Sequence, residues 1–334
     1  MNKTISLAQG NGGLENNELI KEVFYKSFKN DILAKSEDAS IIEKNLAFTS
    51  DSFTINPIFF QGGDIGKLSI CGTCNDLAMM GAKPKYISSA FMIEEGFSLE
   101  LLKKITESMR KELEINGAKI ICGDTKILPK GSLDKIFINT SGIGLLSQEG
   151  ISSNSIKEDD CIIISSSIAR HGASIFAQRE GIEISSELKS DCASLWPIVE
   201  ALIKNKVQIR ALRDATRGGI SAVLNEWAKQ SNINIEVEET KIPICEQVQG
   251  ICEMLGFEPY DLANEGTFVL ALKQSEVKKA LEILHTFDIS KEAVVVAKAS
   301  KNTKDLSQKV ILKSSWGTKR FLDLPSGELL PRIC

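Results

Sequence analysis

Two patterns of alternating strands and helices, separated by a polar segment, most strongly constrain how this chain can fold. The first pattern ends in an apolar strand expected over 135–146, and the second begins with the apolar run 161–164. Residues 148–160 between them are mostly polar and loop-like. Because 334 residues are also many for one hydrophobic core, we predict two domains of α/β (α+β) type with a boundary in this segment.

The predicted organisation has four parts. Residues 1–40 form a glycine-rich segment and a helix, residues 41–150 the N-terminal domain, residues 158–310 the C-terminal domain, and residues 311–334 a last strand and a tail. The 40 basic and 44 acidic residues leave a formal charge of −4, which predicts no general affinity for nucleic acid or an anionic membrane. Without an apolar stretch long enough to span a bilayer or act as a signal peptide, the chain is expected to be cytoplasmic.

Helix signals are clearest in the N-terminal domain. Asp64 follows two glycines in the N-cap position of a helix that runs to about Met80, and Gly81 is its expected stop. A second apolar periodicity between Ser98 and Gly117 predicts another helix. Strands are expected on both sides of these helices, so the domain should combine a sheet with a helical layer.

Four aspartates lie beside glycine-rich turns or element ends: Asp51, Asp64, Asp76 and Asp124. Each alone is typical of a cap or a turn. Three that converge would form a hard-oxygen site for Mg²⁺, which uses substrate phosphates as further ligands. Since the run 62–68 lacks the spacing and the Ser/Thr of a P-loop, a nucleotide would be bound without one.

Two glycine-rich turns could present backbone N–H groups to an anion. The first contains Gly12 and Gly13, and an ordinary turn is the competing interpretation. The run 213–219, Arg-Asp-Ala-Thr-Arg-Gly-Gly, leads into a helix and favours phosphate binding. Glu265 stands before a strand as a base or a turn residue, and His171 is interpreted as a cap or a phosphate contact.

The eight cysteines predict reduced thiols, because a chain of this size does not need disulfides to fold. Cys71 and Cys74 have a C-x-x-C spacing, but packing on a helix explains them better than redox or metal chemistry. Cys334 is the last residue, where a thiol on a mobile end could visit a catalytic site. The competing interpretation of Cys334 is an accident of position.

Five segments together resemble the HypE family of hydrogenase maturation proteins, and the resemblance spans almost the whole chain. Residues 75–81 and the Gly-Asp-Thr of 123–125 are shared with the wider PurM-like superfamily of aminoimidazole ribonucleotide synthetase, selenophosphate synthetase and thiamine-monophosphate kinase. Those segments imply ATP use and fold, whereas the ending Pro-Arg-Ile-Cys separates HypE from these relatives. Gln9 stands where related chains often carry His. The five segments are 62–82, 123–126, 213–219, 264–266 and 331–334.

The resemblance implies a two-domain PurM-like fold, in which the N-terminal domains of a homodimer join their sheets in a β-barrel. A C-terminal α/β sandwich domain and a mobile C-terminal tail follow. It further implies Mg²⁺–ATP on Asp51, Asp76 and Asp124, Lys126 near the transferred phosphate, and Glu265 near the end of the tail. The implied nucleotide contacts are Gly12, Gly13, Asp64, Lys67, Asn75, Thr125, Arg213, Arg217, Gly218 and Gly219.

The family's reaction would give the terminal thiol a task. A HypF carbamoyltransferase would load Cys334 as an S-carboxamide, and ATP-dependent dehydration, with Glu265 or Lys126 as the base, would convert it to a thiocyanate. A HypC–HypD scaffold complex would receive the cyanide for the iron centre of a NiFe hydrogenase. Two alternatives remain open: an ATP-dependent enzyme with a small soluble substrate, and a nucleotide-sensing module whose tail recruits a partner.

Overall fold

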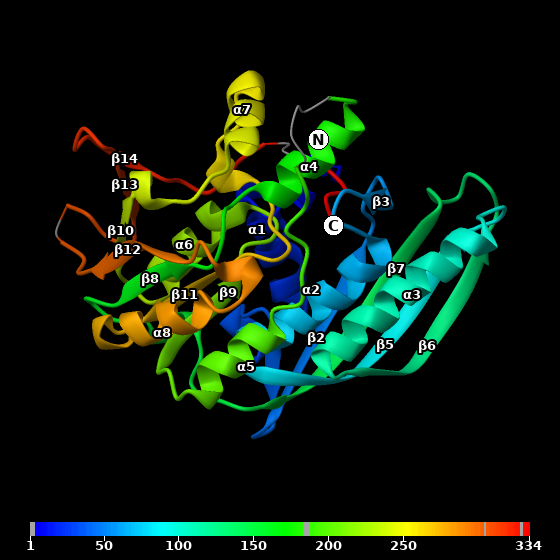
Figure 1. The fold of residues 1–334 in the computed structure, drawn as a ribbon, viewed down its shortest axis with the longest axis horizontal. Coiled ribbons are helices and arrows are strands. Elements are labelled where there is room, and N and C mark those ends of the chain that lie inside the picture. Colours follow the sequence, from blue (N-terminus) through cyan, green and yellow to red (C-terminus); the bar gives the residue numbers. More distant parts are fainter. Residues whose placement is uncertain (1–3, 183–187, 304, 328–329) are drawn as a thin grey trace.

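The computed structural model describes residues 4–182, 188–303, 305–327 and 330–334. Within these residues the chain forms two main sheets, each covered by helices, with a two-stranded hairpin between them (Figure 1). No helix in this part of the chain is both long enough and apolar enough to cross a membrane. All eight cysteines are free.

The first sheet has the strand order β1-β2-β7-β5-β6. Its neighbours pair antiparallel, except that β5 and β6 run parallel and are joined by α3. Helices α2 and α3 contact each other on one face of this sheet (Figure 1). These elements are β1 (Ser40–Ile42), β2 (Leu46–Phe53), α2 (Ile65–Met79), β5 (Ala82–Glu94), α3 (Leu99–Asn116), β6 (Lys119–Leu128) and β7 (Ile136–Leu146).

Helix α2 begins and ends where the sequence predicts. The Asp64 carboxylate accepts hydrogen bonds from the backbone N–H groups of Gly66 and Lys67, at 2.7 and 3.1 Å, which satisfies two free donors of the first turn. Gly66 also permits close helix packing, because a Cβ there would lie 2.3 Å from the carbonyl oxygen of Ile105 in α3. Cys71 and Cys74 are buried on α2, which confirms their structural interpretation.

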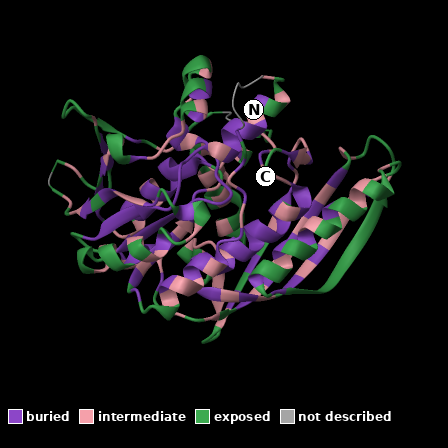
Figure 2. Ribbon diagram, in the orientation of Figure 1, coloured by how far each residue is buried: buried purple, intermediate pink, exposed green. Residues whose placement is uncertain are grey.

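The second sheet has the order β14-β13-β10-β12-β8-β11-β9 and buries its central strands on both faces (Figure 2). Alternate residues of these strands enter two different cores, one containing Ile162 and Val269 and the other Ile163 and Leu270. The strands are β8 (Cys161–Ile164), β9 (Ile209–Asp214), β10 (Asn234–Glu238), β11 (Phe268–Leu272), β12 (Val294–Ser300), β13 (Val310–Lys313) and β14 (Lys319–Phe321). The helices are α4 (Arg170–Arg179), α5 (Trp196–Lys204), α6 (Gly219–Gln230), α7 (Glu246–Leu255) and α8 (Val277–Leu284).

Short elements connect these layers. The hairpin of β3 (Phe59–Phe60) and β4 (Gly63–Asp64) precedes α2, and α1 (Leu14–Leu19) continues into a π-helical turn. The N-terminal segment lies beside the end of the chain, because the N–H of Leu14 donates to the carbonyl of Pro325 at 2.9 Å. The remaining short helices are Leu7–Gly10, Ile20–Tyr25, Leu33–Lys35, Ser153–Ser155, Glu239–Lys241, Pro259–Asp261, Gln274–Glu276 and Asp288–Ser290.

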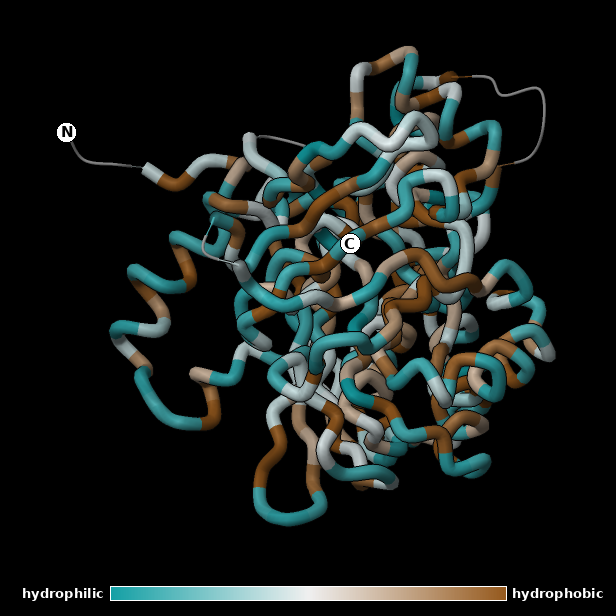
Figure 3. Tube along the Cα trace, turned by 90° about the vertical axis from the view of Figure 1, so that its left-hand side faces the viewer, coloured by the Kyte–Doolittle hydropathy of each residue, from teal (hydrophilic) through white to brown (hydrophobic). Residues whose placement is uncertain are grey.

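The last residues of the chain are docked against the body of the protein. Leu330 and Ile333 are buried, and the chain end marked C lies against the molecule near α2, α4 and β3 (Figures 1 and 3). The sequence predicted a mobile tail, and the structure shows the end of that tail in an inserted position. Residues 328–329 of the predicted tail lie outside the described residues. We use "the tail" below for residues 330–334.

Candidate functional site at the inserted tail

The tail runs alongside the segment that follows β2. The backbone N–H of Thr54 donates to the carbonyl oxygen of Cys334 at 2.8 Å, and the Thr54 hydroxyl donates to the same oxygen at 3.2 Å. The N–H of Asn56 donates to the carbonyl of Arg332 at 3.2 Å. The tail is therefore held by its main chain against the first sheet.

Helix α4 holds the tail from the other side. The Arg179 guanidinium donates to the carbonyl oxygens of Pro331, at 2.6 Å, and Arg332. His171 contributes a 2.8 Å hydrogen bond between its Nε2 and the carbonyl oxygen of Ile333. The sequence interpretation of His171 as a cap or a phosphate contact is therefore wrong, because both ring nitrogens are used inside the protein.

The Cys334 thiol lies among charged groups. Its pKa is raised to about 12, chiefly by desolvation; the Arg217 guanidinium opposes this shift, and the carboxylates of Glu265, Asp51 and Asp214 add to it. A thiol with such a pKa stays protonated at neutral pH, so it is a poor free nucleophile while the tail is docked. The docked position suits chemistry on a group already attached to the sulfur better than attack by the sulfur itself.

Four aspartates from four segments of the chain form what we call the acid cluster: Asp38, Asp51, Asp76 and Asp214. Desolvation raises the pKa of Asp76 well above its usual value, and repulsion from Asp51 and Asp214 adds to this effect. Desolvation also raises the pKa of Asp214 to about 7. Thr49 donates a 2.7 Å hydrogen bond to Asp76. The cluster is therefore built of carboxylates that destabilise one another in the absence of a cation.

Glu265 lies in the turn that precedes β11 and acts electrostatically on the Cys334 thiol. Its backbone N–H and that of Gly266 donate to the Asp191 carboxylate, each at 3.1 Å, which fixes the turn. The Glu265 side chain is buried, and its Oε1 has no hydrogen-bond partner within the described residues. Desolvation, followed by repulsion from Asp214, raises its pKa well above the usual range. A buried carboxylate with an unused oxygen is suited to take up a proton from a nearby group.

The two arginines of the run 213–219 have different surroundings. Arg213 is bound in ion pairs to Asp38 at 2.7 Å and Glu226 at 3.0 Å, and it also donates to the carbonyl of Ser36. Its predicted contact with a nucleotide is therefore not supported, because its donors serve the protein interior. Arg217 is exposed and donates to the carbonyl of Gly10 at 3.1 Å. Its guanidinium also interacts electrostatically with the Cys334 thiol, and this interaction raises the pKa of Arg217.

The glycine turns that were predicted separately lie together. Gly12 has a φ of +74°, and a Cβ there would lie 2.6 Å from the Arg217 carbonyl oxygen. Gly218 has a φ of +82°, and its Cβ would approach the Gly12 carbonyl oxygen at 2.9 Å. Gly219 follows as the first residue of α6, whereas a Cβ on Gly13 would clash with Pro325. Only glycine fits this close approach.

Three other predicted contacts have structural tasks in this chain. The carboxylate of Asp64 caps α2 and accepts a hydrogen bond from Ser108. Lys67 donates to the carbonyl of Gly62 at 3.2 Å. Asn75 is buried and hydrogen-bonds to Ala193 and Leu195, each at about 3 Å, which ties α2 to the segment before α5.

The remaining predicted residues lie on β6. Asp124, Thr125 and Lys126 are exposed, and Asp124 pairs with Lys126 at 2.9 Å. Strand β6 is separated from β2, which carries Asp51, by β7 and β5. Three strand spacings correspond to about 14 Å. One protomer therefore brings Asp51 and Asp76 together but does not bring Asp124 or Lys126 to them.

The acid cluster offers carboxylate oxygens, which are the kind of ligand that a divalent cation such as Mg²⁺ prefers. Among the described residues, no group of three or more His, Cys, Asp or Glu side chains has a geometry that could hold a metal ion by itself. One oxygen of Asp38 is nevertheless buried without a partner among the described residues, and Asp76 is repelled by the other three carboxylates. These features match Mg²⁺, which needs few protein carboxylates and completes its shell with water and phosphate oxygens.

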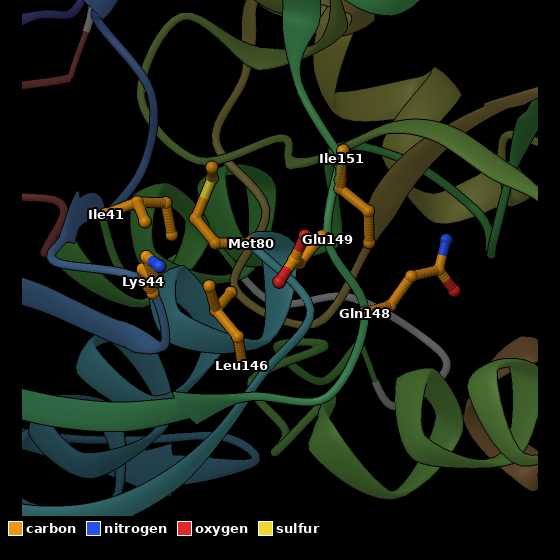
Figure 4. A pocket seen from close by; sticks show the side chains of 8 residues that line it. Ile41, Lys44, Met80, Leu146, Gln148, Glu149 and Ile151 are labelled. Atoms are coloured by element: carbon orange, nitrogen blue, oxygen red, sulfur yellow. The ribbon is translucent and has the colours of Figure 1, made fainter.

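A pocket of about 450 Å³ lies beside the C-terminal end of α2 (Figure 4). Met80, which follows α2, and Leu146, the last residue of β7, contribute to an apolar wall, and Lys44 and Glu149 stand at the polar part of the lining. None of the predicted site residues lines it.

Sequence reasoning missed His171 and Arg179 as tail contacts, and Asp38 and Asp214 as members of the acid cluster. Asp214 lies inside the run that was singled out for its arginines, so the signal was present but was assigned to the wrong side chains. Arg179 carries no local motif. Its role depends entirely on the tail, 152 residues away in sequence, meeting α4.

Two family models match this chain. The model for the AIR synthase related protein, N-terminal domain, covers residues 36–146, and the model for the C-terminal domain of the same proteins covers residues 157–307. The chain is thus an AIR synthase related protein with two domains.

More similar proteins narrow this class. Carbamoyl dehydratase HypE of Escherichia coli (strain K12) is 39% identical over 99% of this chain and 99% of its own length. The structure of a HypE–HypF complex contains a chain with a TM-score of 0.87 and 42% identity, covering 92% of this chain and 99% of that one. A HypE structure in complex with ATP has a TM-score of 0.84 and 38% identity, covering 99% and 100%. The chain belongs to the HypE family.

Proposed function

We propose that this protein is an ATP-dependent carbamoyl dehydratase that acts on its own last residue. The observation that carries the proposal is the inserted tail, which places the Cys334 thiol within the electrostatic reach of Glu265 and Arg217. In this position an S-carboxamide on the sulfur would be enclosed together with a buried carboxylate and beside the acid cluster. Exclusion of water favours dehydration over hydrolysis of the loaded group.

The reaction removes the elements of water in two stages. The carboxamide oxygen attacks the γ-phosphate of ATP, ADP leaves, and one N–H proton is lost, which leaves an imidate phosphate on the sulfur. Removal of the second N–H proton forms the C≡N bond while the C–O bond breaks and phosphate departs. Glu265 is the better candidate for this base, because its carboxylate acts on the pKa of the Cys334 thiol, whereas Lys126 stands on the exposed strand β6 and pairs with Asp124.

The nucleotide would lie between the acid cluster and the Arg217 turn. Asp51, Asp76 and Asp214 would hold Mg²⁺, which neutralises charge on the transferring phosphoryl group. Arg217 supplies a guanidinium, and the glycines at 12, 218 and 219 let the backbone approach closely. The existence of a HypE structure in complex with ATP supports the presence of a nucleotide site in this chain.

A homodimer would complete the site. The outer edge of β6 has no strand partner among the described residues, and Ile120, Ile121 and Ile127 on this strand are 42, 60 and 64% exposed. Figure 2 shows β6 exposed along almost its whole length. Such an edge invites pairing with a second copy. The partner subunit would then bring its own β6, with a second Asp124 and Lys126, towards the nucleotide.

Two further partners follow from the reaction. A HypF carbamoyltransferase would load Cys334 while the tail is exposed, and the HypE–HypF complex supports this partner. The thiocyanate would pass to a HypC–HypD scaffold, where its cyanide becomes a ligand of the iron centre of a NiFe hydrogenase. The tail must therefore alternate between the inserted position and an exposed one.

Intact mass after incubation with the carbamoyl donor system and ATP tests the proposal. Wild-type protein should gain a carboxamide and then lose one water, and peptide mapping should locate both changes on Cys334. The Cys334→Ala variant should acquire neither. Full labelling of that variant, or ATP-dependent phosphorylation of a small molecule instead of dehydration, would overturn the assignment.

A further inference from the structure

We propose that His171 and Arg179 form a clamp, which binds the main-chain carbonyl groups of the tail and thereby sets the position of Cys334 relative to Glu265. Both are positioning residues for the proposed dehydration. Their effect on catalysis rests on the proposed function. The clamp itself is defined by contacts that do not depend on that reaction.

The clamp binds successive carbonyl oxygens and no tail side chain. Arg179 donates to Pro331 and Arg332, and His171 donates to Ile333. Hydrogen bonds to the main chain fix the tail along its length, whatever its side chains are. A shift of the tail by one residue relative to the clamp would move the thiol by about 3.3 Å. Because a general base must lie within about 3 Å of the proton that it removes, such a shift would disconnect the Cys334 adduct from Glu265.

The hydrogen bonds of His171 determine its tautomer. A carbonyl oxygen can only accept, so Nε2 carries the proton that is donated to Ile333, and Nδ1 accepts from the Ser190 hydroxyl at 2.7 Å. The ring is fully buried, and Phe60 packs against it edge-on with 5.5 Å between ring centroids. His171 is therefore a rigid, neutral donor.

The residue that orients His171 is directly followed by the residue that orients Glu265. Ser190 bonds to His171, and Asp191 accepts from the backbone N–H groups of Glu265 and Gly266. A Cβ on Gly266 would lie only 1.8 Å from the Asp191 carbonyl oxygen, so this approach requires glycine. One dipeptide thus positions both the tail anchor and the candidate base.

Arg179 acts through the shape of its guanidinium. It bridges the carbonyls of Asn56, Pro331 and Arg332 from the last turn of α4. Arg332 of the tail is bound separately, by Asp134 at 2.7 Å and by the carbonyl of Thr54 at 2.8 Å. A lysine in place of Arg179 would keep the positive charge but could not span three acceptors.

Alkylation by iodoacetamide, followed by peptide mapping, measures the clamp without any turnover. In the wild type, Cys334 should react much more slowly than the thiol of a free Pro-Arg-Ile-Cys peptide, which serves as the reference for an undocked tail. His171→Leu and Arg179→Lys should each raise the rate at Cys334 about fivefold or more, as expected when a buried hydrogen bond is lost. His171→Gln, whose amide N–H can replace Nε2, should stay close to the wild type.

His285→Leu is the matched control, since His285 makes a similar 2.8 Å bond to a carbonyl, that of Ala293, far from the tail in sequence. It should leave the rate at Cys334 unchanged. Unchanged alkylation in both His171→Leu and Arg179→Lys, with wild-type thermal unfolding, would overturn the clamp. If His171→Leu does not fold, Arg179→Lys and His171→Gln decide.

Mass spectrometry of loaded protein then tests the catalytic part. His171→Leu and Arg179→Lys should accept the carboxamide and convert it at least fivefold more slowly, with recovery in His171→Gln. Faster alkylation without slower conversion would overturn the positioning role. A wild type that loads but never dehydrates would refute the proposed function, while the alkylation result would still support the clamp.

Discussion

The acid cluster and strand β6 carry the same kinds of side chain in opposite surroundings. Asp51, Asp76 and Asp214 come together within one chain, where desolvation raises the pKa of each and repulsion between carboxylates adds to this effect at Asp76 and Asp214. Asp124 and Lys126 stand exposed on β6 and bind each other. One chain therefore preassembles half of the proposed nucleotide site, and the other half remains incomplete until a second subunit supplies it.

Dimers mixed from two variants test whether the nucleotide site is divided between two subunits, and the expected change in ATP turnover is the largest of those considered. Asp76→Asn and Asp124→Asn should each abolish ATP turnover, because each removes a carboxylate from every composite site. When both variants are co-expressed, one site of each heterodimer regains both aspartates, so about one quarter of wild-type turnover should return.

Steady-state ATP hydrolysis by the mixture, compared with each variant alone, is the measurement. Recovery would locate Asp124 in the partner's site. A mixture as inactive as its components, with heterodimers verified by differently tagged chains, would mean that the two aspartates serve the same subunit or that Asp124 has no part in the site.

Replacing the candidate base should have the second-largest effect, a strong reduction in the rate of dehydration. Glu265→Gln should load the carboxamide normally and lose about 10² to 10⁴ in the rate of dehydration, as is usual when a general base is removed. Lys126→Met should instead show a defect in ATP turnover that mixed dimers relieve. Quenched time points analysed by intact mass distinguish the two, and wild-type conversion by Glu265→Gln would make Glu265 only a turn residue.

The thiol itself gives the smallest effect. Docking raises the pKa of Cys334 from the ordinary cysteine value of about 8.5 to about 12. A group whose pKa is raised stabilises the docked state fully below its free pKa and loses this contribution as pH rises towards the docked value. Docking should thus weaken about tenfold between pH 8 and pH 9.5.

The alkylation rate of Cys334 should therefore keep rising above pH 9, whereas that of a free Pro-Arg-Ile-Cys peptide levels off. Peptide mapping across this pH range measures the difference. Parallel profiles for protein and peptide would show that the thiol is not enclosed by the carboxylates at all.

Local signals in the sequence were enough for several elements. The N-cap Asp64 and the stop at Gly81 predicted α2, and Ser98 and Gly117 bound α3 as expected. Strand β5 (Ala82–Glu94), the longest strand of the first sheet, was missed. Its Pro84 reads as a breaker, and it is accommodated at an irregularity in the pairing with β7, which only the neighbouring strand reveals.

The terminal cysteine, the aspartates beside their turns and the glycines that permit close backbone approach were determined by the sequence alone, because each depends on residue type and near neighbours. Tertiary structure decided which of them meet. In the folded chain Arg213 forms buried ion pairs, whereas Arg217 interacts with the Cys334 thiol. Asp124 lies on the exposed edge strand β6, and His171 binds the main chain of the tail. These outcomes depend on contacts between residues far apart in sequence, whose partners no local pattern specifies.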